Sequence, residues 1–367
     1  MEEYEEKVKK IIKEKKIYDC KDLKPFINSI KSILPYRGYS ASHFFMNKEN
    51  KIQFITKLNF YRKDNPELYG TVSKGTVHQN TAEIKVLELL KKEIIDKKIS
   101  PCIIRILYHV DCTNSTKYIT PGDKLCGQYR KTVDENLLGI IYGLFCRNLD
   151  LIRSGISNDR FSFVTLEEGN ITFRKFLTTY VNNSFEGVSV FKTLLFQIIF
   201  TFYQISKKYP SFRHYDLHTD NIMLKFDNSY IFNPIDLKFL IFTNESTHWA
   251  IPYFGVIVKI IDFGFTVIKE EKIISNVIDN KMIMHSRPDN DILFLLNDIY
   301  DTIDNTNIEK MISKLDPTKF YQHFDIKYIR ENEKIVPTYK QMLYNNLWKD
   351  YKNLEVSPSQ RYDTYGT

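Results

Sequence analysis

The sequence predicts an α+β protein in two parts, a strand-rich first part and a mostly helical second part. Apolar residues make up 43% and aromatic residues 14% of the 367 residues, which is typical of a globular chain with more than one core. Short β-branched and aromatic runs dominate before residue 167, whereas helical spacing of apolar residues dominates after it. We therefore place a lobe boundary there, with a small lobe at 33–166 and a large lobe at 167–367.

Residues 1–32 are expected to form an N-terminal helical extension that packs on one of the lobes. Apolar residues recur at helical spacing at Val8 and Ile11, and again at Phe26 and Ile27, with lysines between them. The first residues are acidic and do not resemble a signal peptide.

The small lobe is expected to contain strands and one clear helix. The predicted strands are 43–46, 51–60, 103–110 and 161–166, and the helix is 81–95. Residues 113–160 give no assignable pattern except an apolar patch at 137–145. In the large lobe we expect helices at 173–180 and 188–208 and an insertion around 225–257, in which 237–243 and 251–255 form a hairpin.

Composition argues against several classes of partner. The net charge of +7 comes from lysines spread along the chain, which indicates a solvated surface and no nucleic-acid interface. The apolar run at 191–205 is interrupted by polar residues and is expected to fall short of a membrane span. Five cysteines without paired or metal-ligand spacing fit a reducing, intracellular setting without a disulfide framework. The oligomeric state is left open.

Two short motifs in the second half point to phosphoryl transfer. Asp216 and Asn221 stand five residues apart in residues 214–221, and Asp262 follows an apolar run and precedes Phe-Gly. Phosphoryl transfer from ATP requires one carboxylate to orient the attacking hydroxyl. It also requires an amide oxygen and a second carboxylate to hold Mg²⁺ against the phosphates. The two motifs together supply this set of groups.

These motifs resemble those of the protein-kinase family. In that family a His-Arg-Asp loop follows the long helix of the large lobe, with Asn five residues after the Asp, and an Asp-Phe-Gly motif comes later. The resemblance implies a bilobal kinase-like fold that uses ATP and Mg²⁺. Asp216 would be the catalytic carboxylate, and Asn221 and Asp262 would be the metal ligands.

Three further positions carry a role by the same resemblance. His218 stands where Ser/Thr kinases usually have Lys, and the Asp-Leu-His form resembles haspin-like kinases and the aminoglycoside phosphotransferases. It would contact the transferring phosphate as a catalytic residue, or it is a structural histidine. Tyr215 replaces the family's Arg, which implies activity independent of phosphorylation of the activation loop. Asp291 would anchor the catalytic loop, or it is a helix cap.

The nucleotide-binding residues follow from the resemblance as well. Lys57, on an apolar strand, would pair with Glu83 on the 81–95 helix and hold the α- and β-phosphates. Lys51 and Lys63 are rivals of Lys57, and Glu88 is the second candidate for the acid. Gly38 would belong to the phosphate loop, although an ordinary turn explains it equally well. Leu166 and Glu167 would form the hinge that contacts adenine, or simply end a strand.

The function predicted from the sequence is an ATP- and Mg-dependent serine/threonine protein kinase with a protein substrate. A small-molecule kinase is the first alternative, because no Ala-Pro-Glu follows Asp262. A pseudokinase acting as a binding module is the second. The 40 residues between Asn221 and Asp262 resemble the arrangement in divergent kinases of large DNA viruses. That resemblance implies an intracellular location, in the host cell cytoplasm or the virion.

Overall fold

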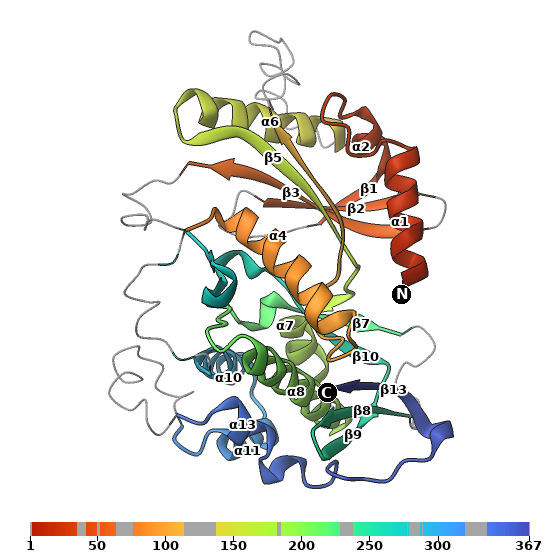
Figure 1. The fold of residues 1–367 in the computed structure, drawn as a ribbon, viewed down its shortest axis with the longest axis vertical. Coiled ribbons are helices and arrows are strands. Elements are labelled where there is room, and N and C mark those ends of the chain that lie inside the picture. The colour runs from red at the N-terminus through yellow and green to blue at the C-terminus, as the bar shows by residue number, and fades with distance from the viewer. Residues whose placement is uncertain are drawn as a thin grey trace. The chain divides into compact units, whose positions relative to one another are not determined.

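The chain divides into two compact units. The computed structural model describes residues 2–34, 42–49, 52–63, 76–113, 137–181, 185–227, 238–276, 278, 287, 289–319 and 336–366. The first unit comprises Met1–Val72 and Arg105–Glu168, and the second comprises Ser73–Ile104 and Gly169–Thr367 (Figure 1). The first is built around a sheet and the second is mostly helical, so the predicted two-part α+β architecture is confirmed.

The first unit contains an antiparallel sheet with strand order β1-β2-β3-β5-β4. The strands are β1 (Ile30–Leu34), β2 (Ser42–Glu49), β3 (Ile52–Arg62), β4 (Ile106–Thr113) and β5 (Ser157–Leu166). The long strand β3 lies in the middle and pairs with β2 on one side and β5 on the other. The two strands that carry the predicted nucleotide-binding residues Lys57 and Leu166 are therefore direct neighbours.

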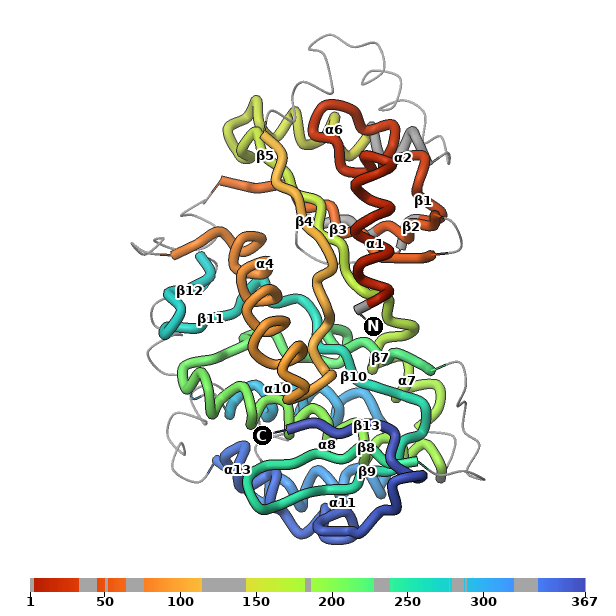
Figure 2. The backbone as a smooth tube through the Cα atoms, turned by 45° about the vertical axis from the view of Figure 1, so that its right-hand side comes forward, coloured from red at the N-terminus to blue at the C-terminus, as the bar shows by residue number. Residues whose placement is uncertain are grey.

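Three helices complete the core of the first unit. They are α1 (Glu2–Glu14), α2 (Lys24–Ser29) and α6 (Leu137–Arg153). Figure 1 and Figure 2 both place α1 beside the strands, and its apolar side Val8 and Ile12 joins one buried cluster with Phe26, Phe45 and Phe163. The predicted extension therefore packs on the sheet as part of its core. The apolar patch at 137–145, within the unassigned region 113–160, forms the first half of helix α6.

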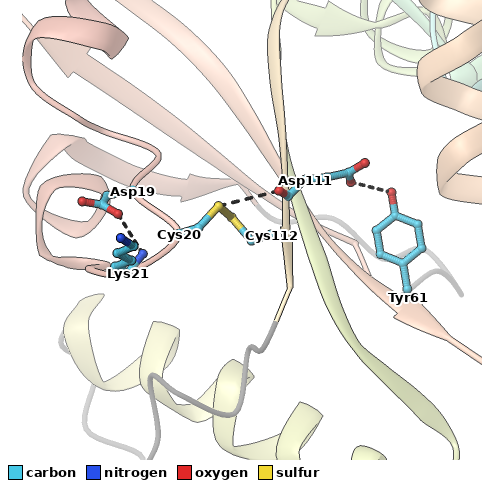
Figure 3. Close-up of a disulfide and its surroundings, with 6 residues drawn as sticks. All are labelled: Asp19, Cys20, Lys21, Tyr61, Asp111 and Cys112. Atoms are coloured by element: carbon cyan, nitrogen blue, oxygen red, sulfur yellow. Dashed lines mark hydrogen bonds between the residues drawn. A yellow bond between two sulfur atoms is a disulfide. The ribbon is translucent and has the colours of Figure 1, made fainter.

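A disulfide joins the extension to the sheet. Cys20, in the segment between α1 and α2, is bonded to Cys112 on β4, which lies 92 residues later in the chain (Figure 3). Cys146 is also disulfide-bonded. The prediction of a chain without disulfides is therefore wrong. It rested on local cysteine spacing, whereas this bond joins residues that only the fold brings together.

Helices dominate the second unit. They are α4 (Gln79–Leu90) continued by the π-helix η1 (Lys91–Ile95), α7 (Phe173–Phe176) continued by the π-helix η3 (Leu177–Val181), α8 (Phe185–Lys208), α10 (Asn290–Thr302), α11 (Thr306–Leu315) and α13 (Tyr339–Leu343). Residues 73–104 belong here and not to the sheet unit, contrary to the predicted boundary. The reason is local packing: α4 contacts the turn at Phe263–Phe265, and Ile103 bridges to Ile260.

Helix α8 is the centre of this unit. By length and composition alone, its residues Glu186–Lys208 could cross a membrane, so the expectation that this run falls short of a span is wrong on that criterion. However, 89% of the most apolar window is buried inside the structure. Phe196 of α8 packs against Phe242, Trp249 and Trp348, which is the environment of a core helix.

Small sheets surround the helices of the second unit. Strands β6 (Ile171–Thr172), β7 (Ile222–Phe226) and β10 (Val256–Ile260) form one, and β11 (Val267–Ile268) pairs with β12 (Ile273–Ile274). The expected hairpin in the insertion is present as β8 (Lys238–Asn244) and β9 (Thr247–Tyr253). The last strand, β13 (Arg361–Gly366), extends this hairpin in parallel with β8 (Figure 2).

Candidate active site

The catalytic loop, residues 214–221, runs between α8 and β7, and its first half is held by helix α10. Asp291, at the start of α10, is completely buried. Its carboxylate accepts hydrogen bonds from the main-chain N–H groups of His214 (2.7 Å) and Tyr215 (3.1 Å), and Arg213 Nε lies 3.3 Å from it. Two N–H donors and a guanidinium offset the desolvation of the acid. Asp291 thus anchors the loop, and Asp289 takes the cap position.

The second half of the loop is held by the same helix two turns further on. Asp298 accepts hydrogen bonds from the main-chain N–H (2.7 Å) and the hydroxyl (2.6 Å) of Thr219. Arg174 of α7 bridges Asp298 (2.7 Å) and Asp220 of the loop (2.6 Å). Asp291 and Asp298 are seven residues apart, so they lie on one face of the helix. Sequence reasoning missed Asp298 and Arg174, although this seven-residue spacing was a visible signal.

His214 connects the loop to the segment that carries Asp262. The residue is completely buried, and its Nδ1 accepts a hydrogen bond from the Asp216 N–H (3.3 Å). Its Nε2 lies 3.0 Å from the carbonyl oxygen of Ile261, and its ring packs on Phe263 at 4.9 Å. Because Nδ1 accepts, Nε2 is the ring nitrogen that donates to the Ile261 carbonyl oxygen.

Asp216 and Asn221 form a hydrogen-bonded pair. The Asn221 amide nitrogen donates to the Asp216 carbonyl oxygen (2.8 Å) and carboxylate (2.9 Å). With the NH₂ group used in this way, the amide oxygen of Asn221 remains as the acceptor that a cation would need. Burial raises the pKa of Asp216 above its ordinary value, and the nearby Asp262 carboxylate adds to this, while His214 and His218 oppose it.

His218 has both a structural contact and a contact with the proposed catalytic acid. Its Nδ1 accepts the Asp220 N–H (3.3 Å) and so caps the short 3₁₀ turn Thr219–Asn221. Its Nε2 lies 3.7 Å from the Asp216 carboxylate, and the side chain is about one-third exposed. The catalytic role of His218 stays a prediction, and the capping contact is present in any case.

The pairing of strands β7 and β10 brings Asp262 close to Asn221. Strand β7 begins directly after Asn221, β10 ends two residues before Asp262, and the two strands pair with Ile260 opposite Ile222. The Ile261 N–H then donates to the Asn221 carbonyl oxygen (3.0 Å). Asp262 has a left-handed backbone with φ of 60°, which is uncommon for residues other than glycine and typical of functional turns.

The three residues offer a donor set that suits Mg²⁺. Among the described residues, no group of three or more His, Cys, Asp or Glu side chains could hold a metal ion. Asn221 and Asp262 present only oxygen donors, and a hard divalent cation prefers these. Burial is the main cause of the raised pKa of Asp216, and the nearby Asp262 carboxylate adds to it. A cation held between the two acids would relieve their repulsion.

The predicted nucleotide-binding residues are distributed over both units. Lys57 is buried on β3 of the first unit, opposite Val164 of β5, and Glu83 is buried on α4 of the second unit. Their pairing stays a prediction because they belong to different units. The rival candidates Lys63 and Glu88 are exposed, which favours the buried Lys57 and Glu83 as the nucleotide-binding residues.

The remaining nucleotide-binding predictions are partly outside the described residues. Gly38 and Lys51 lie outside them. Leu166 is buried at the end of β5. The main-chain N–H of Glu167 donates to the Arg105 carbonyl oxygen (3.0 Å), and its carboxylate accepts the Arg105 N–H (2.9 Å). The Glu167 N–H is therefore already engaged, and the hinge contact with adenine stays a prediction centred on Leu166.

Comparison with known proteins gives two relatives by sequence. Both are proteins of Acanthamoeba polyphaga mimivirus named "putative serine/threonine-protein kinase". One is 27% identical over 326 residues, which cover 82% of this chain and 77% of the relative. The other is 22% identical over 287 residues, which cover 73% of this chain and 53%, about half, of the relative. No family model matches the chain.

Among solved structures, WaaP in complex with acyl carrier protein aligns over 87% of this chain and 90% of its own, at 9% identity and a TM-score of 0.38. This similarity is too low to support an argument. The chain is therefore homologous to two viral proteins named as putative serine/threonine-protein kinases, and it folds into two units with an α+β architecture.

Proposed function

We propose that the protein is an ATP- and Mg²⁺-dependent phosphotransferase that phosphorylates serine or threonine residues of proteins. The observation that carries the proposal is the Asp216–Asn221 pair, which is fixed by two carboxylates of α10 and joined through paired strands to Asp262. Phosphoryl transfer depends mainly on positioning and electrostatic stabilisation, so a rigidly held set of one amide and two acids suits this reaction.

Each residue has one role in this proposal. Ionised Asp216 orients the hydroxyl of the acceptor and takes up its proton. Asn221 and Asp262 hold Mg²⁺, which when bound neutralises charge on the phosphates. Lys57 contacts the phosphates, and the hinge near Leu166 receives adenine. His218, with Nε2 toward Asp216, donates to the transferring phosphate.

The acceptor class separates this proposal from its nearest alternative. The names of the two mimivirus relatives support a protein acceptor, and a small-molecule acceptor is the second enzymatic candidate. A test offers ATP labelled on its γ-phosphate to protein acceptors and, separately, to small hydroxyl compounds. We expect the label on serine or threonine of protein. Label only on a small molecule would replace the first candidate with the second.

The same assay tests the site. Asp262→Ala should abolish turnover of the Mg²⁺ complex of ATP, because a ligand of the metal is lost. Asp301→Ala is the matched control, because Asp301 is an exposed acid on α10 with no role in the site, and it should retain full turnover. Turnover retained by Asp262→Ala would reject the assignment of the site.

A further inference from the structure

The N-terminal extension reaches the strands that carry the proposed nucleotide-binding residues. Tyr18, between α1 and α2, is buried, and its hydroxyl lies 2.7 Å from Thr56 Oγ1 and 2.5 Å from Thr165 Oγ1. Thr56 and Thr165 face each other across β3 and β5, and each directly precedes a predicted contact residue, Lys57 or Leu166. Because neighbouring side chains on a strand point to opposite faces, Tyr18 supports the strands from the face opposite Lys57.

A series of buried, hydrogen-bonded polar side chains determines which group donates in each of these hydrogen bonds. The Thr56 hydroxyl donates to Asn47 Oδ1 (2.6 Å), and the Asn47 amide donates to Ser29 Oγ of α2 (2.7 Å). Because the Thr56 proton is used on Asn47, Tyr18 donates to Thr56 and accepts from Thr165. Every link is buried, so displacing Tyr18 leaves hydroxyls without partners inside the sheet.

Two further contacts tie the extension to the same strands. The Tyr18 ring stacks on Phe163 of β5 with centroids 4.8 Å apart. Glu5 of α1 forms a buried ion pair with Arg105 (3.2 Å), whose main chain pairs with Glu167 at the end of β5. The extension therefore contacts β3, β5 and the predicted hinge, all within the first unit.

The Cys20–Cys112 disulfide secures this arrangement. Cys20 follows Tyr18 by two residues and is partly exposed, whereas Cys112 is buried on β4, the neighbour of β5 (Figure 3). The bond thus ties the segment around Tyr18 to the sheet and leaves one sulfur within reach of a small thiol.

We propose that the N-terminal extension is a redox-sensitive clamp on nucleotide binding, in which Tyr18 positions β3 and β5 and the disulfide holds Tyr18 in place. This inference rests on the proposed function. A dithiol reductant transfers two electrons and two protons to the disulfide, which becomes two thiols, while the reductant becomes a disulfide. Tyr18 is then held only by noncovalent contacts, and the affinity for ATP falls.

The test measures the dissociation constant for ATP with Mg²⁺ on the full chain. A reductant would also act on the disulfide of Cys146, so the double variant Cys20→Ser, Cys112→Ser isolates the bond in question. We expect binding about three- to tenfold weaker than in the wild type. Tyr18→Phe, which keeps the disulfide and loses two hydrogen bonds, should weaken binding by a similar factor. The kcat of both variants should change little, because the catalytic loop is untouched.

Tyr61→Phe is the matched control. Tyr61 is also buried on β3, but its hydroxyl donates to Asp111 (3.0 Å) on β4, so its removal should leave ATP affinity unchanged. Wild-type affinity in folded Tyr18→Phe would overturn the inference, whether or not the cysteine variant folds. Circular dichroism melting establishes folding for each variant. If the wild type itself does not bind ATP with Mg²⁺, the proposed function fails instead.

Discussion

The catalytic loop and the strands around Lys57 are held in position by different interactions. In the second unit, two carboxylates of α10 bind the main chain of the loop at both ends, with Arg213 and Arg174 as their cations. In the first unit, a series of neutral hydroxyl and amide groups, the Glu5–Arg105 ion pair and one disulfide hold the strands. Charge-assisted hydrogen bonds are stronger than neutral ones, so charged groups dominate in holding the catalytic loop, whereas the strands depend largely on neutral hydrogen bonds and a disulfide.

The largest expected effect comes from removing the buried anchor of the loop. Asp291→Ala removes the acceptor of the His214 and Tyr215 main-chain N–H groups and the anion beside the buried Arg213 guanidinium. Breaking a buried charge pair in this way lowers the free energy of unfolding by about 3–5 kcal/mol. Urea unfolding measures this loss. Asp291→Asn, which keeps one oxygen acceptor, should fall between Ala and the wild type. A loss below 1 kcal/mol for Asp291→Ala would show that the buried carboxylate does not hold the loop more strongly than the neutral hydrogen bonds hold the strands of the first unit.

A smaller effect is expected from the second anchor, because Asp298 is partly exposed. Asp298→Ala removes the acceptor of Thr219 and one of the two acid partners of Arg174, so the positions of Asp216 and Asn221 become less well defined. We expect kcat to fall about 10- to 100-fold with the KM for ATP nearly unchanged. Asp301→Ala on the same helix serves as the control in steady-state kinetics. A fall in ATP affinity with unaltered kcat would instead assign Asp298 to nucleotide binding.

The smallest effect concerns the pH dependence of stability. Burial raises the pKa of Asp216 above its ordinary value of 3.8. At a pH between 3.8 and this raised pKa, the folded protein keeps a proton that the unfolded chain has released. The contribution of Asp216 to stability therefore falls as the pH rises through this window and stays unfavourable above it. Asp216→Asn should be inactive, yet at neutral pH as stable as the wild type or more stable.

Thermal unfolding of wild type and Asp216→Asn from pH 3 to 8 checks this, and the advantage of the variant should disappear at the acidic end. A variant less stable than the wild type at neutral pH would mean that hydrogen bonds to the carboxylate outweigh its desolvation. The activity of the wild type should likewise be lost on acidification at a higher pH than an ordinary Asp would give.

The sequence pointed to candidate site residues, but not to the interactions that hold them. Asp216, Asn221 and Asp262 could be named because their spacing is local and the chemistry of phosphoryl transfer restricts residue types, and their roles stay predictions. Asp291 was recognised by resemblance, but Asp298 and Arg174 were missed. Their partners, Thr219 and Asp220, lie 79 and 46 residues away in the chain, and only folding brings them together.

The first unit was predicted less completely for the same physical reason. Strands and the extension could be read from periodicity, and helix α6 was visible only as an apolar patch. The Cys20–Cys112 bond could not be found, because cysteines 92 residues apart carry no local signal of pairing. The buried polar chain from Tyr18 to Ser29 involves residue types that sequence patterns assign to surfaces and turns.

We propose that Asn221 and Asp262 hold Mg²⁺ for a bound nucleotide. Isothermal titration of ATP, with and without Mg²⁺, into wild type and Asp262→Ala tests this most directly. We expect Mg²⁺ to tighten ATP binding to the wild type and to the Asp301→Ala control but to have no such effect on Asp262→Ala. The same Mg²⁺-dependent gain in affinity in all three proteins would contradict it.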